Sequence, residues 1–194
     1  MFELEKVLEF LRENLDDFRY GHSIRVMETA VELARIHGVD EEKAQMAGIL
    51  HDSGKWKSRE KTLQKVQDWG IILSEEERAE YNLVHGALST YIAKNIFGIE
   101  DEDVLNAIKN HITGRPAMSD LEKIVYIADM IEPARNYEFI DDFRAMAKVD
   151  LDRAMYEILN ENLAHLIRND RYIAGSSLEA RNYYLKITKQ GEIK

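Results

Sequence analysis

The chain contains no cysteine and only two prolines among its 194 residues. Without cysteine it can form no disulfide, no thiolate zinc site and no thiol nucleophile. Proline interrupts helices, and the frequent turns of an all-β domain consume proline and glycine, so two prolines and ten glycines favour long helices. The absence of cysteine also agrees with a reducing cytoplasm, where we expect the protein to be located.

Positive charge is scarce, because 26 Lys and Arg residues face 36 Asp and Glu residues for a formal net charge of −10. An acidic surface repels a polyphosphate backbone, and no basic stripe interrupts it, so we expect no extended nucleic acid partner. A small phosphorylated ligand remains compatible with this charge. Bound divalent cations and a few well-placed Lys or Arg side chains can reverse the sign of the charge inside one pocket.

Long hydrophobic runs are also missing. No segment approaches the roughly 18 apolar residues that a membrane-spanning helix requires, so we expect no membrane partner. The first 15 residues, MFELEKVLEFLRENL, alternate apolar with acidic side chains and lack the basic and then apolar pattern of a signal peptide.

Apolar residues instead recur at helical spacing along most of the chain. Gly38, Gly98 and Pro133 stand where helices should end, and Asp40, Asp101 and Ser119 stand where helices should begin. The spacing predicts helices over residues 22–37, from Asp40 into His51 and Asp52, and over 82–97, 101–111, 119–132, 150–168 and 177–188, with a short helix and a loop between Lys55 and Glu80. We predict one all-α domain over residues 1–194, a helical bundle with its motif-bearing core at about 20–135 and C-terminal helices at 150–188.

Several ionisable residues fall on the apolar faces of these predicted helices. They are His22, His51, Asp52, His85, His111 and Asp129. A single inward histidine is usually a hydrogen-bonded core residue, and a single buried carboxylate is costly. A packed core cannot easily satisfy so many such groups one by one, whereas a metal centre satisfies them together. His37 is the exception, since beside Gly38 we expect a solvated cation at a helix end.

The pair His51–Asp52 stands at the end of an apolar helix, before Ser53–Gly54–Lys55, with His22 upstream and Asp129 downstream. This order resembles the HD-domain superfamily of metal-dependent phosphohydrolases and implies a helical bundle of HD-domain type. The local strings narrow the resemblance, and they are HDSGK (51–55), NLVHG (82–86), NHITGRPAMSDLEK (110–123), VYIADMIEPAR (125–135) and SLEARN (177–182). They are similar to the bacterial HD-type symmetrical bis(5'-nucleosyl)-tetraphosphatases, which split diadenosine tetraphosphate into two ADP.

The resemblance implies a ligand set for two metal ions per chain. His22, His51, Asp52 and Asp129 would hold one metal, Asp52 would bridge to a second, and His85 and His111 would complete the second. Imidazole and carboxylate ligands suit iron, manganese, cobalt or zinc better than calcium. The residues do not choose among these metals, and the resemblance implies iron.

The expected chemistry is direct attack of a metal-activated hydroxide on phosphorus, with Asp52 and Lys55 as catalytic residues. Lys55 would contact a phosphoryl oxygen, although its position beyond a helix end also fits a solvated lysine. Further substrate contacts are predicted at His111, Thr113, Gly114, Arg115, Glu132 and Arg135. Gly114 can equally form an ordinary helix C-cap, and Glu132 and Arg135 can pair with each other or orient the site.

We therefore expect a small-molecule nucleotide substrate and symmetrical cleavage of a dinucleoside polyphosphate. Another HD phosphohydrolase acting on nucleoside mono- or triphosphates is the nearest alternative. A regulatory module that binds metal or nucleotide without turnover is a third reading. Amphipathic helices at the two ends of the chain suggest a homodimer, although packing within one chain explains them equally well.

Overall fold

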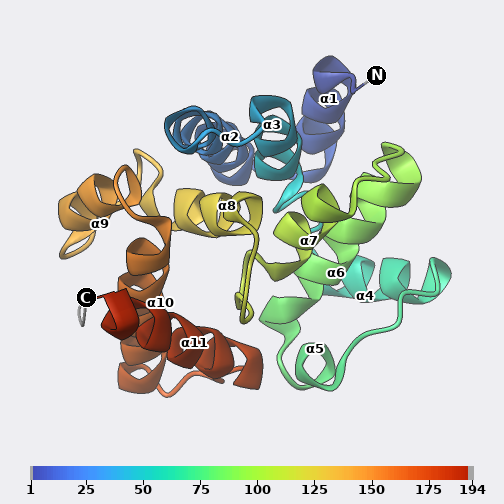
Figure 1. Ribbon diagram of the computed structural model, residues 1–194. Coiled ribbons are helices and arrows are strands. Elements are labelled where there is room, and N and C mark those ends of the chain that lie inside the picture. Colours follow the sequence, from blue (N-terminus) through green and yellow to red (C-terminus); the bar gives the residue numbers. More distant parts are fainter. Residues whose placement is uncertain (1, 192–194) are drawn as a thin grey trace.

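A computed structural model describes residues 2–191, and within this range the chain forms eleven α-helices and no strand (Figure 1). Their bounds are α1 (Leu4–Asn14), α2 (Asp17–His37), α3 (Glu41–Leu50), α4 (Arg59–Asp68), α5 (Glu75–Ala79), α6 (Val84–Tyr91), α7 (Glu102–Asn110), α8 (Asp120–Ile131), α9 (Ile140–Ala147), α10 (Leu151–Arg168) and α11 (Gly175–Gly191). The all-α prediction is confirmed. Between residues 2 and 191 no helix is long and apolar enough to span a bilayer.

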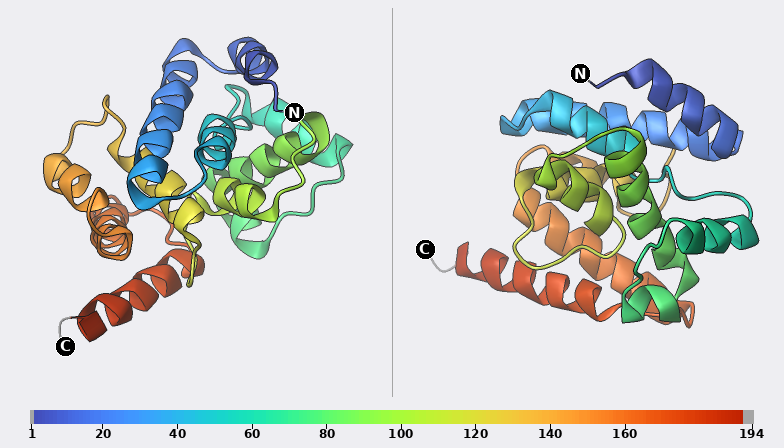
Figure 2. Two further views of the ribbon diagram at one scale, coloured as in Figure 1. Left: turned by 45° about the horizontal axis from the view of Figure 1, so that its top comes forward. Right: turned by 90° about the vertical axis from the view of Figure 1, so that its right-hand side faces the viewer.

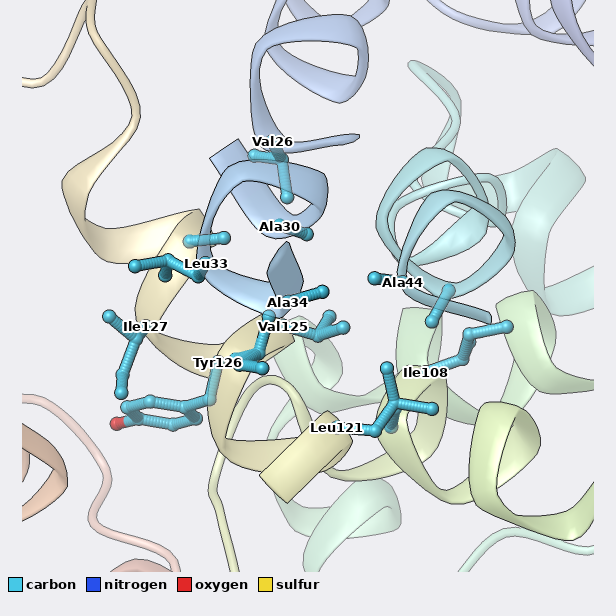
Figure 3. Packing of buried hydrophobic residues seen from close by; sticks show 14 of the residues in the cluster. Val26, Ala30, Leu33, Ala34, Ala44, Ile108, Leu121, Val125, Tyr126 and Ile127 are labelled. Carbon is cyan, nitrogen blue, oxygen red and sulfur yellow. The ribbon is translucent and has the colours of Figure 1, made fainter. Parts of the chain in front are cut away.

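Helix α8 lies at the centre of the arrangement, because α2, α3, α7, α9 and α10 all pack against it (Figures 1 and 2). Nine of its 12 residues are buried, and seven of these nine are apolar or aromatic, as expected for a helix with a wide apolar face. Figure 3 shows Val125 and Leu121 of α8 beside Ala34 of α2, Ala44 of α3 and Ile108 of α7. This packing fixes the relative positions of the helices that carry the inward histidines and aspartates.

The helix starts follow from local chemistry. The side chains of Asp40, Asp101 and Ser119 accept hydrogen bonds from backbone N–H groups at the starts of α3, α7 and α8. Glu122 completes a capping box with Ser119 by accepting from its backbone N–H at 2.8 Å. Gly38 ends α2 in the left-handed region, at φ 69°. These predicted helix ends are confirmed.

The prediction of one continuous α-helix over residues 82–97 is wrong. The segment divides into a 3-10 turn, η1 (Tyr81–Leu83), then α6, and then a π-helical turn, η2 (Ile92–Ile96). In the π-helical turn, the N–H of Phe97 donates to the carbonyl of Ile92 at 3.2 Å, five residues back. Apolar spacing alone does not reveal such a change in winding.

The segment from Lys55 to Glu80 contains two helices where the sequence predicts one. Ser58 caps α4 and Ser74 caps α5, the latter through a capping box with Glu77. Helix α9 was not predicted, because Phe139 precedes it without any side-chain cap and with φ 68°.

His37 is not the solvated side chain that the sequence predicts. Its Nε2 lies 2.7 Å from the carbonyl oxygen of Ala147, and the side chain is half-buried. The imidazole therefore connects the C-terminus of α2 to the C-terminus of α9.

Candidate metal centre

Five elements bring the inward histidines and aspartates together. His22 lies on α2, His51 and Asp52 follow the end of α3, His85 lies on α6, His111 follows α7, and Asp129 lies on α8. The histidines and Asp52 are buried, whereas the side chain of Asp129 retains 18% exposure. Asp129 therefore marks the side on which the cluster opens to solvent.

One part of the cluster joins α2, α3 and α8. His22 Nε2 lies 3.0 Å from Asp129 Oδ1. Nitrogen or oxygen atoms of His22, His51 and Asp129 all lie within 4.8 Å of one another, so these side chains could hold one metal ion.

A second part is centred on Asp52. Its Oδ1 lies 3.1 Å from His85 Nε2 and 3.5 Å from His111 Nε2, and these two nitrogens are 3.2 Å apart. Ligand atoms of His51, Asp52 and His111 also lie within 4.8 Å of one another. Because His51 belongs to both groups and Asp52 adjoins both, the two groups form one continuous centre.

Hydrogen bonds from behind fix how the imidazoles point. The Nδ1–H groups of His51 and His111 donate to the backbone carbonyls of Gly48 at 2.7 Å and Ile108 at 2.6 Å. The Nδ1–H of His22 donates to Glu132 Oε1 at 3.2 Å. With the proton on Nδ1, each Nε2 carries a lone pair directed into the cluster, which is the tautomer that a metal ligand needs.

The Nε2 atom of His51 tests whether a metal ion fits. It is fully buried and has no hydrogen-bond partner among the described residues, and Asp52 Oδ2 is 3.8 Å away. A buried polar atom without a partner is costly. A cation held beside Asp52 would satisfy this atom, so the donor set fits a divalent metal.

The protonation states agree with metal ligation. Burial lowers the pKa of His51 to about 3 and that of His85 to about 4. Burial alone would raise the pKa values of Asp52 and Asp129, but the neighbouring imidazoles hold both below the usual range. Neutral imidazoles and ionised carboxylates are the forms that bind metals.

Three cationic side chains surround the open side of the centre. Arg19 Nη1 and Lys55 Nζ lie 3.2 and 3.4 Å from Asp52 Oδ2, and Arg135 Nη2 lies 2.7 Å from Asp129 Oδ1. Each is about one-third exposed, so each can also reach a bound anion. Arg19 was not predicted from the sequence, although its position three residues before His22 puts both side chains on one helix face.

Glu132, which the sequence predicts to contact the substrate, is buried on the side of the centre that faces α2. Its carboxylate is only 2% exposed and accepts from Arg25 Nε at 2.6 Å and from the backbone N–H of Ala134 at 2.7 Å, besides His22. The chain turns to extended backbone at Glu132, with ψ 154°, and Pro133 follows. This turn directs the carboxylate back toward α2. Arg135 comes within 3.9 Å of it.

Thr113, Gly114 and Arg115 form the turn after His111. Gly114 adopts φ 68°, which confirms the left-handed C-cap. The Arg115 guanidinium pairs with the buried Glu122 at 2.8 and 2.5 Å and donates to the carbonyl of Pro116 at 3.1 Å. These bonds fasten the turn to α8, and Thr113 lines a neighbouring cavity.

One cavity reaches the centre through His85, and a second cavity shares Asn82 with the first. The Lys55 cavity has a volume of about 240 Å³, and its lining includes Arg19, Lys55, Trp56, Lys57, Asn82 and His85. The Tyr172 cavity has a volume of about 260 Å³, and its lining includes Asn82, Thr113, Asn162, His165, Arg171 and Tyr172. Among the described residues, Asp16 is the one acidic side chain that lines the Lys55 cavity, whereas Arg19, Lys55 and Lys57 are basic, so this cavity is cationic within an acidic protein.

Comparison with known proteins places this geometry in a family. The HD domain family matches residues 19–134. The chain is 37% identical over 182 residues to a symmetrical bis(5'-nucleosyl)-tetraphosphatase of Halalkalibacterium halodurans, covering 93% of this chain and 96% of that protein. It is 38% identical to the protein of the same name from Staphylococcus aureus, covering 93% of this chain and 94% of that protein.

A solved structure is similar along nearly its whole length. It is the crystal structure of a predicted HD superfamily hydrolase from Clostridium acetobutylicum, described as involved in NAD metabolism. The TM-score is 0.89 at 41% sequence identity, covering 96% of this chain and 98% of that chain. The match to the HD domain spans every residue of the metal cluster, from His22 to Asp129. The chain therefore belongs to the HD-domain family, in the branch that contains the symmetrical bis(5'-nucleosyl)-tetraphosphatases.

Proposed function

We propose that this chain is a metal-dependent hydrolase that cleaves diadenosine tetraphosphate, or a related dinucleoside polyphosphate, symmetrically into two nucleoside diphosphates. The observation that carries the proposal is the buried His51 Nε2, which has no hydrogen-bond partner among the described residues and lies in a cluster of histidines and aspartates. The names of the relatives and their coverage of nearly the whole chain support the substrate.

The metal is proposed to be iron, with two ions per chain, and manganese, cobalt and zinc are the alternatives that the ligands allow. We assign the ligands as His22, His51, Asp52, His85, His111 and Asp129. When bound, such cations supply Lewis-acid chemistry, because they lower the pKa of a water molecule and neutralise phosphate oxygens.

The chain's own residues position the polyphosphate. Lys55 and Arg19 contact Asp52, and Arg135 contacts Asp129, so all three hold positive charge where phosphate oxygens would enter. A phosphate placed there would give each of these cations a second anionic partner beside its carboxylate. Hydrolysis adds the oxygen of water to one central phosphorus and breaks its bond to the bridging oxygen. A nucleoside diphosphate leaves on each side.

We also propose that the chain acts as one domain, because in the described part of the chain one hydrophobic cluster runs from Val7 to Tyr184. A homodimer remains a prediction from the amphipathic terminal helices.

The test begins with protein purified without chelator. Bound transition metals are measured, and products from diadenosine tetraphosphate, ATP, GTP and AMP are separated by chromatography. We expect about two metals per chain and ADP as the sole product from diadenosine tetraphosphate. His51→Ala should abolish turnover, whereas His37→Ala, which removes a histidine outside the cluster, should retain it.

The outcomes separate the candidate functions. If ATP or AMP is hydrolysed and diadenosine tetraphosphate is not, the metal centre stands and the dinucleotide assignment is wrong. A folded protein that binds nucleotide or metal without any turnover would instead be the regulatory module.

A further inference from the structure

We propose that the Tyr172 cavity is the binding site for the second nucleoside of the substrate, opposite a first nucleoside held in the Lys55 cavity. This inference rests on the proposed function, since only a substrate with a nucleoside at each end needs two such sites. It adds a specificity site built from Arg171 and Tyr172, which lie beyond the HD-domain match at residues 19–134.

The placement of the two cavities relative to the metal centre is the first argument. Asn82 lines both cavities. His85 lines the Lys55 cavity, and Thr113, two residues after His111, lines the Tyr172 cavity. His85 and His111 meet at 3.2 Å, so the Lys55 cavity reaches this edge of the centre through His85, and the lining of the Tyr172 cavity comes within two residues of His111 along the chain. A chain of phosphates cut at its midpoint needs its two ends on opposite sides of the reacting atoms.

The similar sizes of the cavities are the second argument. Their volumes are about 240 and 260 Å³. A symmetrical dinucleotide carries the same nucleoside at both ends, so its two sites must accommodate groups of equal size. The larger share of cationic lining in the Lys55 cavity, from Arg19, Lys55 and Lys57, suits it to the phosphates next to the first nucleoside.

The chemistry of the Tyr172 cavity is the third argument. Leu83, Ile112 and Leu166 give it apolar surface, and Tyr172, a residue that is 43% exposed, adds an aromatic ring. Asn162, Thr113 and Ser177 contribute amide and hydroxyl groups. A planar base is held by aromatic stacking over apolar surface, and a ribose is held by a few hydrogen bonds, so this lining matches a nucleoside.

Arg171 is the fourth argument. It lines the Tyr172 cavity and is exposed, and within residues 2–191 its guanidinium makes no hydrogen bond or ion pair. The neighbouring Arg168, in contrast, pairs with Glu161. An unpaired guanidinium in a cavity that also has an aromatic ring is suited to a phosphate of the departing nucleoside diphosphate or to the face of its base.

The experiment compares two substrates that differ only in the second nucleoside. Diadenosine tetraphosphate has it, and adenosine 5'-tetraphosphate carries the same four phosphates without it. In the metal-loaded enzyme, Tyr172→Ala should raise the KM for diadenosine tetraphosphate about tenfold with kcat nearly unchanged, because one stacking contact is lost. The KM for adenosine tetraphosphate, or its Ki if it only inhibits, should change by less than about twofold.

Two further variants make the result specific. Tyr172→Phe keeps the ring and should restore a KM close to that of the wild type. Phe139→Ala removes another exposed aromatic residue, 52% exposed and next to α9, and should affect neither substrate. Thermal melts of all variants establish that they are folded.

Two results would overturn the second site alone. One is a wild-type enzyme that forms ADP from diadenosine tetraphosphate while Tyr172→Ala keeps its KM within about twofold. The other is an equal loss on both substrates, which would indicate general damage to the active site. If the wild-type enzyme forms no ADP from diadenosine tetraphosphate, the proposed function fails and the second nucleoside site fails with it.

Discussion

The metal centre and the walls of the adjoining cavities are built in opposite ways. In the centre, His22, His51 and His111 are buried, and each imidazole is held from behind by a carbonyl or a carboxylate. In the cavity walls, Lys57, Arg171 and Tyr172 are exposed, and the two cations make no ion pair within the described part of the chain.

This difference in burial indicates that the centre serves the reaction and that the cavity walls serve substrate recognition. Metal ligands must be held within fractions of an ångström, and burial with outer-shell hydrogen bonds achieves this. Side chains that recognise a substrate must exchange water for that substrate, so they lie at the surface and on connecting segments. Substitutions in the centre should therefore change metal content and turnover, whereas substitutions in the walls should change substrate affinity alone.

The largest effect should come from Asp52→Asn. The substitution keeps the shape of the side chain but removes the charge that adjoins both parts of the centre. We expect kcat to fall at least about a thousandfold, together with the metal content. Circular dichroism should show a retained fold, and Asp142→Asn, on an exposed part of α9, should behave as wild type. More than a tenth of the wild-type turnover in Asp52→Asn would contradict the assignment.

A smaller effect should follow from Glu132→Gln. Glu132 holds His22 in the ligating tautomer, and loss of such an outer-shell partner typically weakens metal affinity about 10- to 100-fold. Isothermal titration calorimetry of the metal-depleted variant and of the wild type measures this change in metal affinity.

Glu122→Gln is the matched control, because Glu122 is also fully buried and pairs with an arginine, but within residues 2–191 it makes no hydrogen bond or ion pair to the histidines and aspartates of the cluster. Its loss should lower the free energy of unfolding by about 1–3 kcal/mol and leave the metal affinity unchanged. Equal metal affinities for the Glu132→Gln and Glu122→Gln variants would contradict the proposal that Glu132 supports metal binding through His22.

The smallest of these effects should come from Lys55→Ala. Lys55 is a partly exposed cation at the open side of the centre, where it would contact a substrate phosphate. Because one charged contact is lost, kcat/KM should fall about tenfold, while the metal content stays constant. Lys61→Ala, on the exposed face of α4, is the control. A fall in metal content for Lys55→Ala would show that this lysine supports metal binding, and would contradict the division between the metal centre and the cavity walls.

The sequence predicted the centre better than its surroundings. His22 and Asp129 lie on long helices whose apolar spacing shows that they face inward. That they meet in one ligand set was implied by the family resemblance. The role of Glu132 depends on a backbone turn before Pro133, which spacing does not reveal. Helix α9 was missed because Phe139 gives no capping signal. Arg171 and Tyr172 lie in the connection between α10 and α11, where no periodicity predicts side-chain direction.

The most direct test of the account is anomalous diffraction from crystals of protein purified without chelator. Data collected on both sides of the iron absorption edge locate and identify any bound metal. We expect anomalous density within bonding distance of His51 Nε2 and of the Asp52 carboxylate, since these groups lie together at the heart of the cluster. An active crystal form with no metal at this position, for iron or for any of the alternative ions, would contradict the central claim.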